Sequence, residues 1–136
     1  MVKGLLADIN AIGQVRAIVQ HMQSESWREF WNLLGLSLKH FEDIGLSRSS
    51  SDLEIWRACQ SEQLILITDS RNQASPDSLE ATIRQYNEAN SLPVFTIGDF
   101  HKFRTRRQYA EAVVEKLYDY LMRIDEVRGT GRLYLP

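Results

Sequence analysis

The chain has 136 residues and a formal net charge of −2, with 43% hydrophobic and 25% charged residues. This length suits one domain, and the balance excludes a disordered chain or a polycation built for bulk nucleic-acid binding. No apolar run approaches the ~18 residues of a membrane-spanning helix and no signal peptide is evident, so we expect a single cytoplasmic domain without a membrane contact. The single cysteine, Cys59, is expected to be a buried helix residue.

The chain opens with an apolar run that stops at an acidic residue. Leu5–Ala7 is predicted to be a short buried strand, and Asp8 then stands at its carboxyl end. Apolar residues at spacings of three and four over 11–23 predict a helix with one buried face. The first strand and helix therefore place a carboxylate at their junction.

A second helix is predicted over 26–34. Ser26 and Glu29 have the spacing of a capping box, and Gly35 supplies a stop. The partial alternation of apolar and polar residues over 36–41 predicts a second strand. Helix and strand patterns thus continue to alternate.

The centre of the chain contains the clearest strand. Residues 49–60 have capping serines and negative charge in the first turn, including Asp52, and so predict a helix. Leu64–Thr68 is a continuous aliphatic and β-branched run, which is typical of a parallel strand covered on both faces. This strand ends at Asp69.

The next helix and strand follow the same pattern. Ser75 and Pro76 are expected to open a helix, with proline in its favoured first position. Its inner stripe is predicted to consist of Leu79, Ile83 and Tyr86. Residues 93–97 predict a fourth strand, and Asp99 after it is expected to cap a helix rather than bind a metal.

The last part of the chain is predicted to be one long helix and a tail. The helix extends from about Thr105 to Asp125, and residues 128–136 are expected to be an extended tail. Four fixed positive charges occur within the seven residues 101–107. Such a basic run is commonly a solvated helix start, and a phosphate-binding edge is the alternative.

Alternating strands and helices predict a three-layer α/β/α fold with a mainly parallel sheet. In such sheets the functional crevice lies outside the carboxyl ends of the strands. We therefore expect Asp8, Asp52 and Asp69 to come together there. Clustered carboxylates repel one another, and a divalent cation such as Mg²⁺ relieves that cost and supports phosphodiester hydrolysis.

Several stretches resemble the PIN-like domains related to the toxins of bacterial toxin–antitoxin pairs. The first strand resembles theirs in ending at an acidic residue that is followed closely by an asparagine. The similarity covers roughly residues 4–72 and rests on Leu6–Asn10, His40–Leu46, Ser51–Trp56 and Leu64–Asp69.

The resemblance implies a PIN-like fold and a Mg²⁺- or Mn²⁺-dependent ribonuclease that acts on single-stranded RNA. It assigns Asp8, Asp52 and Asp69 as catalytic metal ligands, and Asn72 stands near the place of a further acid. The residues expected to contact RNA are Asn10, Arg71, Lys102, Arg104 and Arg107.

A catalytically weak or inactive binding module is the alternative function. An amide such as Asn72 is a weaker magnesium ligand than a carboxylate. The module would bind RNA or a protein partner, such as an antitoxin-like protein or a second copy in a homodimer. Trp27, Phe30 and Trp31 would suit a partner surface, although such a trio at helical spacing is more commonly core. A serine hydrolase is disfavoured because no Gly-x-Ser-x-Gly motif occurs.

Overall fold

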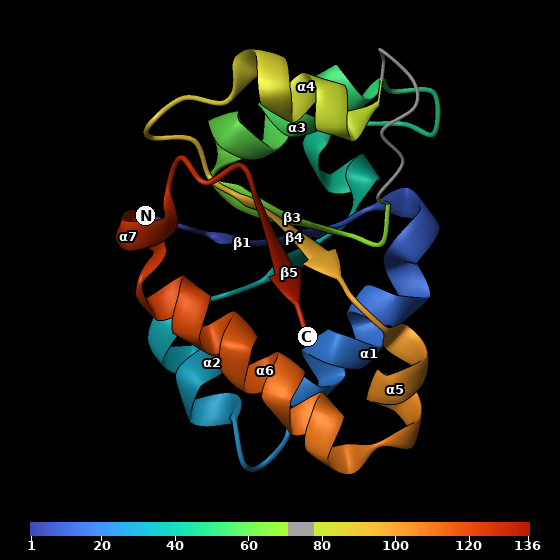
Figure 1. Cartoon of the computed structure of the whole chain (residues 1–136), viewed down its shortest axis with the longest axis vertical. Helices are drawn as coiled ribbons and strands as arrows, with labels where there is room; N and C mark the ends of the chain where they lie inside the picture. The colour runs from blue at the N-terminus through green and yellow to red at the C-terminus, as the bar shows by residue number, and fades with distance from the viewer. Residues whose placement is uncertain (71–77) are drawn as a thin grey trace.

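The computed structural model describes residues 1–70 and 78–136, which form a parallel sheet between two layers of helices (Figure 1). The strands are β1 (Gly4–Ala7), β2 (Leu38–Lys39), β3 (Leu64–Thr68), β4 (Val94–Ile97) and β5 (Arg132–Leu135). Their order is β2-β1-β3-β4-β5, and every neighbouring pair is parallel. The predicted three-layer α/β fold is confirmed, with the strand order of one common doubly wound sheet.

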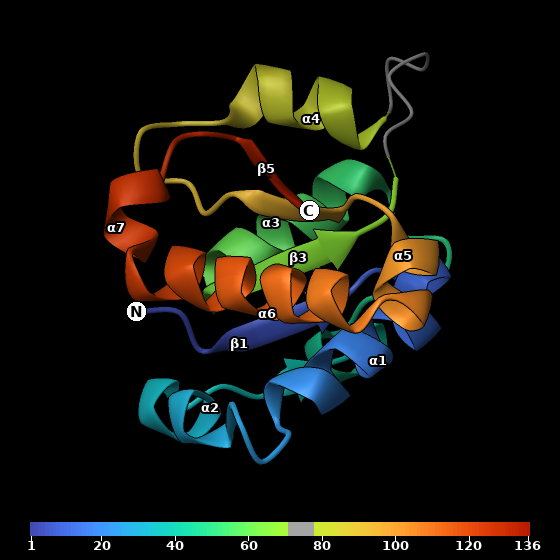
Figure 2. The same ribbon diagram turned by 60° about the horizontal axis from the view of Figure 1, so that its bottom comes forward.

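Helices cover both faces of this sheet (Figure 2). The α-helices are α1 (Ile12–Met22), α2 (Arg28–Leu34), α3 (Asp52–Glu62), α4 (Leu79–Tyr86), α5 (Phe100–Thr105), α6 (Arg107–Met122) and α7 (Ile124–Val127). Two short 3₁₀ helices are η1 (Ile9–Ala11) and η2 (Phe41–Ile44). Within the described ranges, no helix combines the length and apolar character needed to span a membrane.

The sheet separates two apolar cores because successive strand side chains point to opposite faces. Leu5 and Ile65 belong to the core under α1 and α6, whereas Leu6 and Leu66 belong to the core under α3 and α4. All of β1, β3 and β4 is buried. These strands read as continuous apolar runs because each of their faces is covered by helices.

The helix ends agree only in part with the predictions. Gly35 ends α2 with the left-handed φ of 62°, as expected. The Ser26 capping box is wrong, because α2 begins at Arg28 and its N-cap, Trp27, makes no side-chain cap bond. A capping box does form at α3, where the Ser51 hydroxyl accepts the N–H of Glu54.

The predicted long helix and tail need correction. Residues 105–125 do not form one helix, because α6 is separated from the shorter α5 and α7. The predicted tail contains β5, which pairs with β4 and places Leu135 beside Ile97. The Arg132 side chain of β5 is only 8% exposed, and its Nε donates to Glu80 Oε2 at 3.0 Å. The sheet thus gains an edge strand that the sequence pattern does not indicate.

The aromatic trio on α2 mainly packs against α6. Trp31 is buried, and Trp27 stacks on Tyr118 with ring centroids 5.7 Å apart. Trp27 Nε1 also donates to Glu111 Oε2 at 2.7 Å. The core interpretation is confirmed for these two residues, while Phe30 stays 37% exposed.

We predict that Leu135→Ala lowers the free energy of unfolding by about 2–5 kcal/mol, because it empties a fully packed site in the core. Leu135 is 1% exposed, whereas Leu33 is 77% exposed. The matched variant Leu33→Ala should change stability by less than about 0.5 kcal/mol. Urea unfolding measures both, and equal effects would show that the last residues do not dock as β5.

Candidate active site

The two acidic residues at the ends of β1 and β3 leave the sheet toward opposite faces. Asp8 lies two residues after Leu6, whose side chain faces α3 and α4. Asp69 lies two residues after Ile67, which faces α1 and α6. The two-residue period of a strand therefore directs Asp8 and Asp69 to different sides.

Asp8 and Asp52 line one pocket at the carboxyl ends of β1 and β3. The pocket has a volume of about 220 Å³ and lies on the side of α3 and α4. Polar side chains from several loops complete it, namely Asn10, Arg48, Ser50 and Ser70. It stands between the two strands where the connections diverge, which is where doubly wound sheets bind ligands.

The Asp8 carboxylate is held by its neighbour at the end of β3. The Thr68 hydroxyl donates to Asp8 Oδ2 at 2.6 Å, and the backbone N–H of Asp8 donates to Ile67 O at 3.0 Å. Thr68 is fully buried, and its hydroxyl also accepts the N–H of Ser70 at 3.0 Å. Asp8 is thus fixed in position while its second carboxylate oxygen makes no hydrogen bond to another described residue.

The negative charge of Asp8 acts on two groups of α3. Burial, together with the Asp8 charge, raises the pKa of Asp52, and a backbone interaction with Leu79 opposes this rise. Burial, again with the Asp8 charge, raises the pKa of the Cys59 thiol to about 12. Cys59 is a buried core residue, as expected. The ion pairs of the described chain include neither Asp8 nor Asp52.

Asp69 does not join this pair. It is exposed, and its Oδ2 accepts the amide of Gln14 on α1 at 2.9 Å. It lines a separate pocket of about 240 Å³ with Gly98 and Phe100. Residues 1–70 and 78–136 contain no group of three or more acidic, histidine or cysteine side chains that could hold a metal. The structure therefore brings Asp8 and Asp52 together in one pocket and places Asp69 in another.

The other predicted site residues do not all line the Asp8–Asp52 pocket. Asn10 lines the Asp8–Asp52 pocket, whereas Arg71 and Asn72 lie outside the described residues. Asp99 caps α5 by accepting the N–H of Lys102 at 3.0 Å, as expected.

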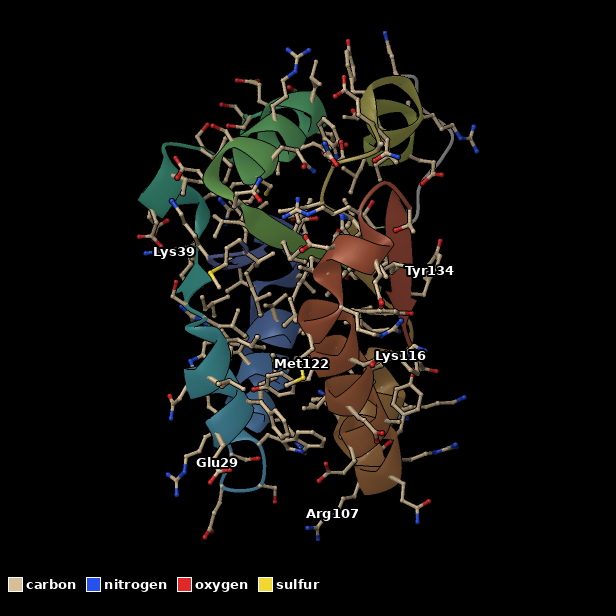
Figure 3. All side chains as sticks on the ribbon, turned by 90° about the vertical axis from the view of Figure 1, so that its left-hand side faces the viewer. Glu29, Lys39, Arg107, Lys116, Met122 and Tyr134 are labelled. Atoms are coloured by element: carbon tan, nitrogen blue, oxygen red, sulfur yellow. The ribbon has the colours of Figure 1, made fainter. Side chains whose placement is uncertain are left out.

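The basic run does not reach the Asp8–Asp52 pocket. Lys102 and Arg104 lie on α5, which begins at Phe100 of the Asp69 pocket. Arg107 begins α6 at the end of the molecule away from α3 and α4 (Figure 3). Of the described basic residues, only Arg48 lines the Asp8–Asp52 pocket. The sequence signal that could have identified Arg48 is its position four residues before Asp52, in the loop that precedes α3.

The donor set of the pocket fits a hard divalent cation. Asp8 and Asp52 supply carboxylate oxygens from two different elements, which Mg²⁺ and Mn²⁺ accept. The raised pKa of Asp52 reflects burial beside a like charge, and a cation would relieve that repulsion. Two carboxylates suit a cation that keeps water and substrate oxygens among its ligands.

No protein-family model matches the chain, and no curated protein or solved structure is significantly similar to it.

We predict that Asp52→Asn stabilises the protein at neutral pH more than at pH 3.5. The folded-state pKa of Asp52 is raised above its ordinary 3.8. The folded state therefore keeps the Asp52 carboxyl protonated up to a higher pH than the unfolded state does. The contribution of Asp52 to unfolding free energy therefore falls as pH rises from 3.8 through the raised folded-state pKa. Urea unfolding across pH 3–7 measures the difference between the two proteins.

Asp8→Asn provides the control for this pH dependence. This variant keeps Asp52 but removes the neighbouring charge. Adding Asp52→Asn to it should therefore change the pH dependence of the unfolding free energy less than adding Asp52→Asn to the wild type does. A variant Asp52→Asn that loses the same stability at every pH would indicate that Asp52 only supports the N-terminus of α4 through Leu79.

Proposed function

We propose that this protein is a PIN-like, metal-dependent endoribonuclease that hydrolyses single-stranded RNA at the Asp8–Asp52 pocket. The observation that supports this proposal is the placement of two electrostatically coupled carboxylates in one pocket at the switch point of the sheet. A bound Mg²⁺ or Mn²⁺ would neutralise charge on the phosphate and lower the pKa of an attacking water.

The residues of the pocket have distinct roles in this mechanism. Asp8, oriented by the Thr68 hydroxyl, holds the cation with Asp52 on the facing helix. Arg48 provides positive charge for the phosphate that carries the scissile bond. Ser50, Ser70 and Asn10 supply hydrogen-bonding groups that position the RNA backbone.

A binding module without turnover is the second candidate. It is favoured by the hydrogen bond from Gln14 to Asp69, which holds a third acid on the other side of β3. A partner protein would then use the exposed apolar side chains beside α2 and α6. These are Phe30, Leu33 and Met122, of which Met122 is labelled in Figure 3.

Cleavage assays decide between the two candidates. We expect the purified chain to cut a labelled single-stranded RNA panel with Mg²⁺ or Mn²⁺ and to lose this activity with a chelator. Asp8→Asn and Asp52→Asn should each lower the rate by roughly two orders of magnitude or more, as loss of transition-state charge stabilisation does. Asp69→Asn is the matched control and should retain most of the rate.

Contaminating ribonucleases are excluded by the double variant Asp8→Asn, Asp52→Asn. Cleavage that survives in this variant or in chelator would remove the pocket from the mechanism. Binding of RNA without cleavage by the wild type, in both metals, would favour the module.

We predict that replacing Arg104, Arg106 and Arg107 together by alanine flattens the salt dependence of RNA binding. Each phosphate interaction that the substitutions remove should reduce the slope of log affinity against log salt by roughly 0.7 for a single strand. Lys3→Ala is the control, because Lys3 precedes β1 and so lies at the amino ends of the strands. An unchanged slope in the triple variant would show that the run is a solvated surface that takes no part in binding.

A further inference from the structure

A polar groove lies between α3 and α4, next to the Asp8–Asp52 pocket. Its volume is about 510 Å³, and residues at the start of α3 and along α4 line it. Ser50 and Asp52 line this groove as well as the pocket. The two hollows therefore share a wall, and one extended ligand could occupy both.

The groove has the chemistry of a nucleobase site. Tyr86 offers an aromatic ring, and Gln85 and Thr82 offer an amide and a hydroxyl on the same helix. Apart from Asp52, its lining contains no charged side chain among the described residues. A neutral base with donors and acceptors on its edge suits such a lining better than a phosphate does.

The Tyr86 ring is held in place by its neighbours. The Arg57 guanidinium lies over the ring, 4.9 Å from its centroid, and Tyr86 is packed in part against the core under α3 and α4. Arg57 is not part of the groove lining, so it supports the ring without filling the groove. Bases of single-stranded RNA stack on aromatic rings and on arginine planes held in this way.

We infer that this groove binds the base of the RNA nucleotide next to the cleaved phosphate, by stacking on Tyr86. The inference rests on the proposed nuclease function for the position of that phosphate. The strand would run from the Asp8–Asp52 pocket along α3 and α4, and Gln85 would contact the edge of the stacked base. None of the basic residues of the run 101–107 lines this groove.

Binding of a fluorescent oligouridine 12-mer to the full chain in chelator tests the groove without cleavage. We expect Tyr86→Ala to weaken binding about five-fold or more, the loss typical of one stacked base. Tyr86→Phe and Tyr86→Trp keep a ring and should bind within about two-fold of wild type. Tyr134→Ala is the matched control, because Tyr134 is 48% exposed on β5 and lines neither hollow.

Photocrosslinking of the wild-type chain keeps the inference testable if Tyr86→Ala does not fold. Oligo(5-iodouridine) should crosslink at Tyr86 or Gln85, as read by mass spectrometry. Crosslinks confined to other surfaces, or unchanged affinity of a folded Tyr86→Ala, would overturn the groove assignment even if the wild type cleaves RNA. Crosslinks at Tyr86 without any cleavage would keep the groove and reject the nuclease.

Discussion

The pairing of β1 with β3 is the constraint on which the rest of the molecule depends. Leu6 lies opposite Leu66 and Ala7 opposite Ile67, and both strands are buried on their two faces. The same register continues one step past β1, where the N–H of Asp8 donates to Ile67 O. This register places Thr68 beside Asp8 and fixes the Asp8 carboxylate at the carboxyl ends of the strands. A shift of one residue would turn the carboxylate into the opposite core.

Much of this architecture can be predicted from the sequence, because the buried strands are continuous apolar runs. The positions of Asp8 and Asp52 can also be predicted, because Asp8 directly follows a strand and Asp52 begins a helix. The placement of Asp69 in a separate pocket depends on how β3 pairs with β1, and this register cannot be read from either strand alone. β5 escapes prediction for another reason. Arg132 looks like a tail residue, but its side chain is buried against Glu80, Thr96 and the carbonyl of Ser70. That partnership exists only in the folded protein.

The separation of the acids changes what the site needs from its ligands. A pocket with two carboxylates leaves more positions on a cation for water and phosphate than one with three does. It also carries less negative charge, so an arginine in its wall can meet a phosphate without being neutralised by a third acid. Arg48 has that place here. The face of the sheet on which each acid emerges thus governs the net charge of the pocket.

The reactivity of the Cys59 thiol reports the motion of α3, the helix that carries it and covers this site. Its pKa of about 12 leaves almost no thiolate at neutral pH while α3 is docked on the sheet. A small alkylating reagent can therefore react only when α3 moves away from the sheet and exposes the thiol to solvent. The rate of that reaction reports how often the helix bearing Asp52 leaves the sheet. A ligand that binds the Asp8–Asp52 pocket and the groove between α3 and α4 would slow this opening, whatever chemistry follows.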